Sequence, residues 1–315
     1  MKDIKADKIT VIGIGGVGGY LSALLCQTFS HVTLVARGGR RKTLETDGLR
    51  LNSDYKGRIH THPERIADSL SDITEIQDYV FICVKNYSLD TIAQEVQKIA
   101  DDHTVIMPVM NGVEAGDKLR SNLTRGIVVD SSIHIVAFAE PDYSIRHIGN
   151  YAYIRFGIMN PSTEHAAVLE RLKELLCTAD IDCDNRADIL AAIWDKYMLN
   201  CAFNVLTAYY DTDVDGLRNS EKRKAEFRTL LEEAMAVAGA LHITVAADFA
   251  EREFDRVILK LSGSASTSLK RDMHEGRAGE LETFSGHLNR LADSLNVNIP
   301  LSRKLYTELR KRADS

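Results

Sequence analysis

The chain has 315 residues, of which 44% are apolar and 27% charged, and it carries a formal net charge of -6 with a sequence pI of about 5.9. This length favours two domains, and the composition is that of an ordinary globular protein, which excludes a disordered or collagen-like chain. The acidic balance excludes a global positive field, so we expect no nucleic-acid partner and no membrane partner.

The five cysteines include no C-x-x-C pair, and their odd number argues against a closed disulfide framework. The spacing of histidines and cysteines predicts no metal site. Residues 1–8 are charged and lack the apolar stretch of a secretory signal, and the sequence holds no apolar run of membrane-spanning length. We therefore expect a cytoplasmic protein.

Short β-branched runs alternate with amphipathic stretches through the first half, which is typical of a parallel sheet with crossover helices. Strands are predicted at residues 8–13, 32–36, 79–85 and 104–108, and helices at 17–29, 88–100 and 114–122. Residues 127–129, 144–148 and 151–156 are interpreted as further strands of the same sheet. A helix at 164–179 then closes the domain, and 181–186 is interpreted as the connection to the next one.

The second half shows helical periodicity almost throughout. Helices are predicted at residues 189–209, 220–242, 247–261, 280–295 and 300–312, with a loop at 262–279. The predicted fold class is α/β: an N-terminal Rossmann-type doubly wound domain, residues 1–185, followed by an all-helical C-terminal domain, residues 186–315.

A glycine-rich turn follows the first predicted strand and opens the first predicted helix. It has the pattern G-x-G-x-x-G and consists of Gly13, Ile14, Gly15, Gly16, Val17 and Gly18. In this setting the first glycine permits a tight turn, the second admits a pyrophosphate, and the third allows close packing of helix on strand. The phosphates then lie at the helix N-terminus, so the turn predicts dinucleotide binding.

The second strand ends at Arg37, where an NAD enzyme would place a carboxylate for the ribose 2′-hydroxyl. A guanidinium there binds a 2′-phosphate instead, which favours NADP (NADPH) as the cofactor. Lys85 and Asn111 follow the strands at 79–85 and 104–108. Because ligands bind beyond the carboxyl ends of parallel strands, these residues are expected beside the glycine turn, although Asn111-Gly112 is also a common turn dipeptide.

Three polar residues recur every four positions in the otherwise apolar segment that follows Trp194. Lys196, Asn200 and Asn204 therefore share one helix face. A desolvated lysine loses preference for its charged form, which suits a proton donor to the oxygen of a ketone. The alternative is that the amides bind neighbouring backbone and the lysine reaches solvent. Spacing alone gives Ser268, Asp272 and Glu280 only a weak link to a substrate.

Together these residues resemble the ketopantoate reductase family. The resemblance rests on the glycine turn, Arg37, Lys85 and Asn111-Gly112, and it continues through Trp194, Lys196, Asn200 and Asn204 to Ser268, Asp272 and Glu280. These elements span nearly the whole chain and stand in the family's order.

The resemblance implies NADPH-dependent reduction of 2-dehydropantoate to (R)-pantoate, on the route to pantothenate and coenzyme A, in a cleft between the two domains. It makes Lys196 the general acid and Asn111 a second catalytic residue, which helps to place the nicotinamide and the substrate. Substrate binding is assigned to Asn200, Asn204, Ser268 and Glu280. Arg37 and Lys85 bind the NADP phosphates, and Glu280 also contacts the cofactor. No role is assigned to His134 or to residues 211–215.

Three other readings remain open. In the first, the enzyme reduces another branched 2-keto acid. In the second, the chain is a 3-hydroxyacid dehydrogenase, whose Rossmann-plus-helical plan is similar. In the third, it is a non-catalytic sensor that binds NADPH. The segment with Ser268, Asp272 and Glu280 favours the ketopantoate reductase family over the 3-hydroxyacid dehydrogenases. The presence of Lys196 argues against a sensor, because a sensor needs no buried proton donor. The expected partner is a small-molecule 2-keto acid. A homodimer is compatible with the sequence, which does not specify the oligomeric state.

Overall fold

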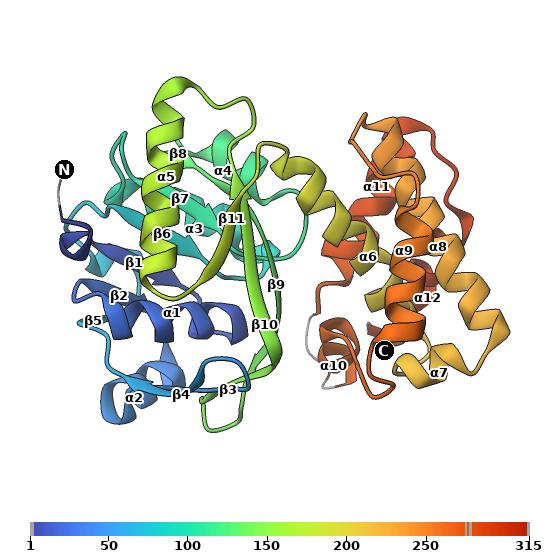
Figure 1. Cartoon of the computed structure of the whole chain (residues 1–315), viewed down its shortest axis with the longest axis horizontal. Coiled ribbons are helices and arrows are strands. Elements are labelled where there is room, and N and C mark those ends of the chain that lie inside the picture. Colours follow the sequence, from blue (N-terminus) through green and yellow to red (C-terminus); the bar gives the residue numbers. More distant parts are fainter. Residues whose placement is uncertain (1–2, 275, 277–278, 314–315) are drawn as a thin grey trace. The chain divides into compact units, whose positions relative to one another are not determined.

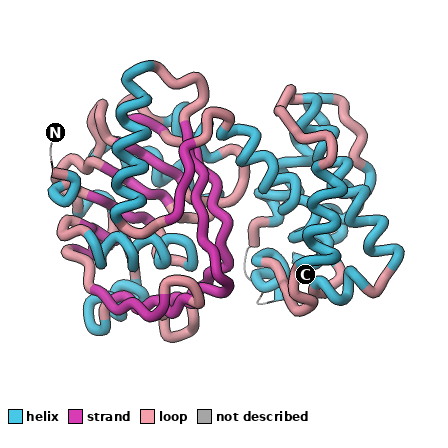
Figure 2. The backbone as a smooth tube through the Cα atoms, in the orientation of Figure 1, coloured by secondary structure: helices cyan, strands magenta, loops and turns pink. Residues whose placement is uncertain are grey.

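The computed structural model describes residues 3–274, 276 and 279–313. It divides into two compact units, Met1–Ile189 and Leu190–Ser315. The first unit combines strands and helices, whereas the described part of the second consists of helices and loops (Figures 1 and 2). The predicted fold class is confirmed.

The main sheet of the first unit is parallel and has the order β5-β2-β1-β6-β7-β8. Its strands are β1 (Ile9–Ile12), β2 (Val32–Val35), β5 (Arg65–Ala67), β6 (Tyr79–Ile82), β7 (Val105–Pro108) and β8 (Ile127–Val128). The four central predicted strands are confirmed, as is the short strand near residue 127. The chain order reverses between β1 and β6, which is the point where open α/β sheets bind ligands.

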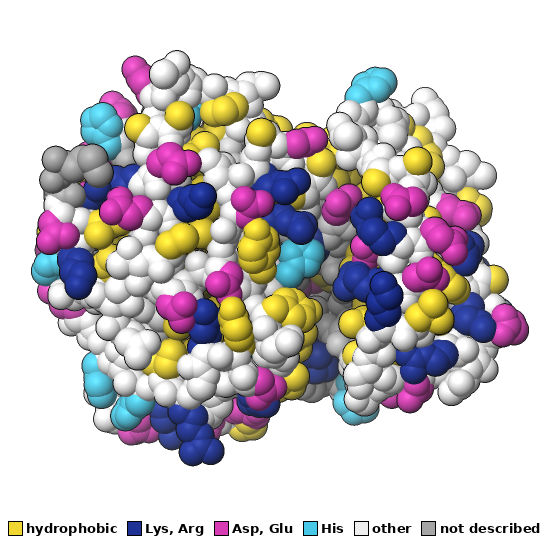
Figure 3. Space-filling model, viewed as in Figure 1, with side chains coloured by type: hydrophobic (Ala, Val, Ile, Leu, Met, Phe, Trp, Pro, Cys, Tyr) yellow, Lys and Arg dark blue, Asp and Glu magenta, His cyan; other side chains and the backbone are white. Residues whose placement is uncertain are grey.

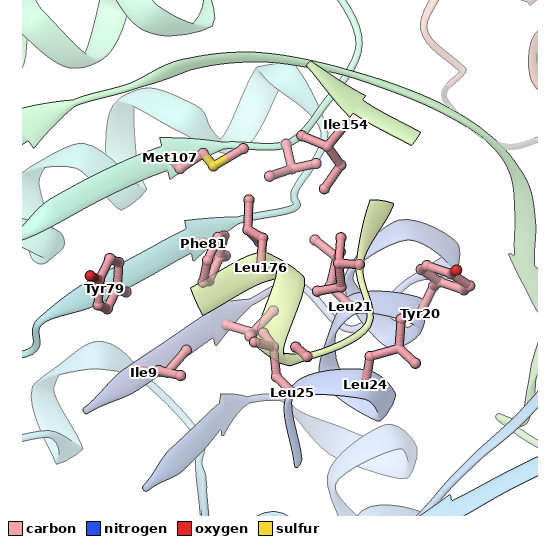
Figure 4. Close-up of a cluster of buried hydrophobic side chains, with 14 of the residues drawn as sticks. Ile9, Tyr20, Leu21, Leu24, Leu25, Tyr79, Phe81, Met107, Ile154 and Leu176 are labelled. Carbon is pink, nitrogen blue, oxygen red and sulfur yellow. The ribbon is translucent and has the colours of Figure 1, made fainter. Parts of the chain in front are cut away.

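Both faces of this sheet are buried, because successive side chains of each strand enter different cores. Phe81 of β6 joins the core formed with α1 (Gly16–Thr28) and α5 (Thr163–Thr178), whereas its neighbours Val80 and Ile82 join the core under α3 (Leu89–Val96) and α4 (Ala115–Asn122). Figure 4 shows the first core, where Leu21 and Leu25 of α1 lie with Phe81 and Leu176. This double coverage defines the doubly wound fold.

The predicted helices of the first unit are present, with two differences. The helix predicted at 88–100 changes to a 3-10 turn at Gln97–Ile99, and a further helix, α2 (Gly38–Asp47), follows β2 directly. Because α2 begins at Gly38, Arg37 is its N-terminal flanking residue.

The prediction that residues 144–148 and 151–156 extend the main sheet is wrong. They form one long strand, β10 (Ile145–Gly157), interrupted by a register shift between Ile148 and Tyr153. β10 belongs to a second sheet of order β11-β10-β3-β4, to which β9 adds by antiparallel pairing. The other strands of this sheet are β3 (Leu49–Ser53), β4 (Gly57–Thr61), β9 (Asp130–Ala139) and β11 (Asp182–Asn185).

Residues 181–186 are therefore more than a connection, because they contain β11. This strand pairs in parallel with residues 153–156 of β10, and the chain then enters the long helix α6 (Ile189–Tyr209).

The second unit has the predicted helices at nearly the predicted positions. They are α6, α8 (Glu221–Ala240), α9 (Phe249–Asp255), α11 (His287–Leu295) and α12 (Pro300–Ala313), joined by the shorter α7 (Val214–Arg218). Two of the predicted helices include π-helical turns, Arg256–Lys260 after α9 and Glu282–Gly286 before α11. The predicted loop at 262–279 is wrong in its middle, where α10 (Ser268–His274) forms; its residues 275 and 277–278 lie outside the described residues.

Within residues 3–274, 276 and 279–313, no helix is both long and apolar enough to cross a membrane. Acidic and basic side chains are interspersed on the visible face of each unit (Figure 3), as expected for a net charge of only -6 on 315 residues.

Candidate functional site

Four predicted site residues follow four neighbouring strands of the main sheet. Arg37 follows β2, Gly13 follows β1, Lys85 comes shortly after β6, and Asn111 shortly after β7. Since these strands are parallel and adjacent, their carboxyl ends meet at one edge (Figure 1). The structure therefore brings the four residues to the same edge of the sheet, around the point where strand order reverses.

The glycine turn leaves room for a ligand at one glycine and none at the others. Gly13 has φ +88°, and a Cβ there would lie 2.7 Å from the Cys83 carbonyl oxygen. A Cβ on Gly18 would lie 1.9 Å from the Gly13 carbonyl oxygen, so α1 packs tightly on the turn. At Gly15, in contrast, a Cβ would meet nothing within 4 Å. The backbone is thus open at the N-terminus of α1.

The other residues of the turn are structural. Gly16 packs against β9, since a Cβ there would lie 2.2 Å from the Ala137 carbonyl oxygen. Ile14 is buried, and Val17 packs against the first core. Only their backbone groups are then available to a bound phosphate, and unpaired amides at a helix N-terminus favour anions.

Arg37 is exposed and is held in place by a residue that the sequence did not reveal. Its Nε donates to the backbone carbonyl oxygen of Asp68 at 2.9 Å. The Asp68 carboxylate forms an ion pair with Arg41, which also pairs with Glu45. Asp68 directly follows β5, and because that strand was not predicted, the position of Asp68 beside Arg37 was not predicted either.

Lys85 and Asn111 lie in loops that are tied together by a partly buried hydrogen bond. Asn86, directly after Lys85, is buried and donates from Nδ2 to the Glu114 carboxylate at 2.9 Å. Gly112 has φ +100°, which an Asn-Gly turn accommodates without strain. The sequence reasoning missed Asn86 and Glu114, because their pairing spans 28 residues.

In the second unit, the polar face of α6 meets the start of α10. Asn204 is buried with an exposed fraction of 6%. Its Nδ2 donates to Asn200 Oδ1 at 3.1 Å, and its Oδ1 accepts from the Ser268 hydroxyl and the Leu269 amide, both at 3.3 Å. The structure thus brings Asn200, Asn204 and Ser268 together, and Asn204 supplies a cap to α10. Asp272 lies one turn further along α10.

Lys196 lies on the same face and is half-buried, whereas Glu280 is buried with an exposed fraction of 5%. Burial lowers the pKa of Lys196 to about 8, and the negative charge of Glu280 opposes that decrease. A lysine in this range exchanges its proton near neutral pH, which an ordinary surface lysine does not.

The π-helical turn after Glu280 is anchored to α6. The Tyr197 hydroxyl donates to the backbone carbonyl oxygen of Phe284 at 2.9 Å, and the Cys201 thiol donates to the same oxygen at 3.5 Å. Both donors stand beside the Lys196 and Asn200 positions on α6. The sequence did not predict this anchor, because a π-helical turn leaves no mark on apolar periodicity.

The residues that had no assigned role make structural contacts. Asp211 pairs with Lys270 at 3.5 Å, Asp213 accepts from the Gly216 amide at the start of α7, and Asp215 pairs with Arg218 at 2.8 Å. His134 lies on β9. In the described part of the chain, no three His, Cys, Asp or Glu side chains gather closely enough to hold a metal ion.

Two family models match this chain, and known proteins resemble it along almost its whole length. The model described as ketopantoate reductase PanE/ApbA matches residues 9–161, and its C-terminal counterpart matches residues 188–313. The 2-dehydropantoate 2-reductase of Mesorhizobium japonicum is 26% identical over 331 residues, with 96% of this chain and 98% of the relative covered.

Solved structures give the same result. A PanE/ApbA family ketopantoate reductase from Ralstonia eutropha JMP134 is 25% identical, covers 98% of both chains and has a TM-score of 0.87. D-mandelate dehydrogenase, solved with NADH and anilino(oxo)acetate, is 17% identical over 98% of both chains with a TM-score of 0.86, which shows a shared fold. Since the two family models together cover most of residues 9–313, the chain belongs to the ketopantoate reductase PanE/ApbA family of oxidoreductases.

Proposed function

We propose that this protein is a 2-dehydropantoate 2-reductase that uses NADPH to reduce its substrate to (R)-pantoate, a step toward pantothenate and coenzyme A. Membership of the family and the likeness to the Mesorhizobium japonicum enzyme support this activity. We assign cofactor binding to residues 1–185, and substrate binding and proton transfer to residues 186–315.

The residues at the edge of the main sheet fit a dinucleotide. Backbone amides of Gly13, Ile14, Gly15, Gly16, Val17 and Gly18 would hold the pyrophosphate at the N-terminus of α1. The open space at Gly15 supports this assignment, because a side chain there would fill the position of a phosphate. Arg37 and Lys85 would bind the phosphate groups, with Arg37 selecting NADP over NAD. Asn111 would place the nicotinamide, together with Glu280.

Lys196 would act as the general acid. NADPH, when bound, supplies a hydride to the C2 ketone, and the ketone oxygen then needs a proton. The observation that carries the proposal is the place of Lys196 on the face of α6 where Asn204 bonds to Asn200 and Ser268. Burial at this position lowers the pKa of Lys196 to about 8, against the charge of Glu280. At neutral pH this ammonium is still protonated and gives up its proton more readily than an exposed lysine does. Nζ of Lys196 would therefore donate to the ketone oxygen and stabilise its developing charge.

The amides and the hydroxyl of the second unit would bind the substrate. Asn200 and Asn204 are pre-oriented by their mutual hydrogen bond, and Ser268 is oriented by Asn204. Such a row of donors and acceptors suits a carboxylate and a hydroxyl group, and 2-dehydropantoate carries one of each. Glu280 would accept a hydrogen bond from the substrate hydroxyl.

The test measures turnover for each combination of two substrates and two cofactors, as the loss of absorbance of the reduced nicotinamide. The purified protein is given 2-dehydropantoate or 2-ketoisovalerate, each with NADPH or NADH. Fast turnover with 2-dehydropantoate and NADPH, with much slower turnover in the other three combinations, is the expected result. Faster turnover of 2-ketoisovalerate would overturn the assignment of 2-dehydropantoate as the substrate, and equal turnover with NADH would overturn the preference for NADPH. Tight NADPH binding without turnover of any keto acid would favour a sensor.

A further inference from the structure

Two of the five cysteines form a pair at the end of the first unit. Cys177 lies in the last turn of α5 and Cys183 is the second residue of β11, and their sulfur atoms are 3.8 Å apart. Among the described residues, this is the one sulfur-to-sulfur contact within hydrogen-bonding distance. A disulfide has an S–S bond of about 2.05 Å, so closure needs about 1.8 Å of further approach.

The segment between the two cysteines is a tight turn held at both sides. Ile181 donates its amide to the Leu176 carbonyl oxygen at 2.9 Å, and Asp180 adopts φ +56°. Lys56, on the turn between β3 and β4, forms ion pairs with Asp180 at 3.0 Å and Asp182 at 3.8 Å. These contacts hold the turn in one conformation, so the turn keeps the two sulfur atoms next to each other.

The two thiols differ in their access to solvent. Cys177 is exposed, whereas Cys183 is half-buried and packs against the first core. Burial and the neighbouring Cys177 raise the pKa of Cys183 above its ordinary value, so Cys183 keeps its proton at neutral pH. A solvent-borne oxidant thus reaches Cys177 first, with a second thiol already in contact.

We propose that Cys177 and Cys183 are a reversible oxidation site that closes to an intramolecular disulfide when the protein meets hydrogen peroxide. The Cys177 thiolate attacks one peroxide oxygen, the O–O bond breaks and hydroxide leaves, which gives a sulfenic acid. The sulfur of Cys183 then attacks the Cys177 sulfur, the S–S bond forms, and the S–O bond breaks. The Cys183 proton leaves with this hydroxyl as water, and the proton that Cys177 lost on forming its thiolate joins the hydroxide as a second water. One peroxide thus accepts two electrons from the two thiols.

This site is separate from the proposed reduction. In the described part of the chain, Cys177 and Cys183 contact each other and Cys183 packs against the first core, at the junction of α5 and β11, and neither residue is assigned a role in the reduction. The proposal therefore stands or falls independently of the substrate.

The test uses the full-length protein, reduced, freed of reductant and treated with a small excess of hydrogen peroxide. Thiol titration under denaturing conditions should fall from five cysteines to three, and peptide mapping should show Cys177 linked to Cys183 with two hydrogen atoms lost. Dithiothreitol should restore all five thiols. Cys177→Ser should yield no linked peptide, whereas Cys26→Ser, which removes an unpaired cysteine, should still lose two thiols.

Three outcomes would overturn the proposal. They are an unchanged count of thiols, oxidation of Cys177 to sulfinic acid while Cys183 stays free, or a bridge between Cys177 residues of two chains. Non-reducing electrophoresis distinguishes the last from an internal bridge.

Discussion

Replacing Glu280 by Gln should move the pH dependence of the reductase to lower pH. Lys196 must be protonated to act as an acid, so activity is present below its pKa and lost as the pH rises through it. In the wild type that pKa is about 8, and the Glu280 charge holds it up against the effect of burial. Removing an opposite charge next to a partly desolvated lysine lowers its pKa by about one unit or more. The midpoint of the descending limb should therefore shift from about 8 to about 7 or below.

The size of the effect can be stated at a single pH. At pH about 8, one half of the wild-type Lys196 is protonated, whereas a pKa of about 7 leaves about one eleventh, a decrease of about fivefold. The assay is kcat against pH at saturating NADPH and 2-dehydropantoate. The midpoint is the measured quantity, because Glu280 is also assigned to substrate binding and its loss lowers the absolute rate.

A matched control is Glu282→Gln. Glu282 is an exposed carboxylate two residues away that pairs with Arg290 and accepts a hydrogen bond from Tyr306. It does not contribute to the pKa of Lys196, so this variant should keep the wild-type midpoint. If Glu280→Gln kept the midpoint as well, or raised it, the electrostatic coupling of Glu280 to Lys196 would be refuted.

Three other changes have defined outcomes. Arg37→Asp should weaken NADPH binding by tenfold or more, on the order of 1.5 to 3 kcal/mol, and NADH binding far less; equal losses by fluorescence titration would refute the 2′-phosphate role. Glu233→Ala should lower the free energy of unfolding by about 1 to 3 kcal/mol, because this buried carboxylate accepts from the Leu301 and Ser302 amides at 2.9 and 2.8 Å; an unchanged urea midpoint would contradict this. Burial lowers the pKa of His147, so its stabilisation is present above pH ~6.5 and lost as the pH falls toward the folded-state value. His147→Asn should flatten the corresponding part of the stability profile, and an unaltered slope would count against it.

Except for the edge strand β5, the main sheet could be predicted because its strands are short, β-branched and separated by amphipathic helices. The second sheet could not, because its pairings are distant in sequence. Residues 145–147 of β10 pair with residues 51–53 of β3, and no local signal specifies a partner so far away. β11 is polar, with the sequence Asp-Cys-Asp-Asn, and it becomes a strand only through its ladder with β10.

The second unit shows the same limit at α10. Residues 262–279 are rich in Ser, Gly and Thr, which favours a loop. Yet the Oδ1 atom of Asn204 accepts from the Leu269 amide, so the cap that stabilises α10 comes from a helix 65 residues away. The polar face with Lys196, Asn200 and Asn204 could be predicted because α6 is long and regular. The π-helical turn after Glu280 could not be predicted, because it leaves no mark on apolar periodicity.

The central claim is that Lys196 supplies the proton for the reduction of 2-dehydropantoate, and the most direct measurement is kcat and NADPH affinity for wild type and Lys196→Ala side by side. The account predicts turnover by the wild type, a decrease in kcat of about 10² to 10⁴-fold in the variant, and the same dissociation constant for NADPH in both. Comparable turnover by the two proteins would contradict it, and so would an equally large loss of NADPH affinity.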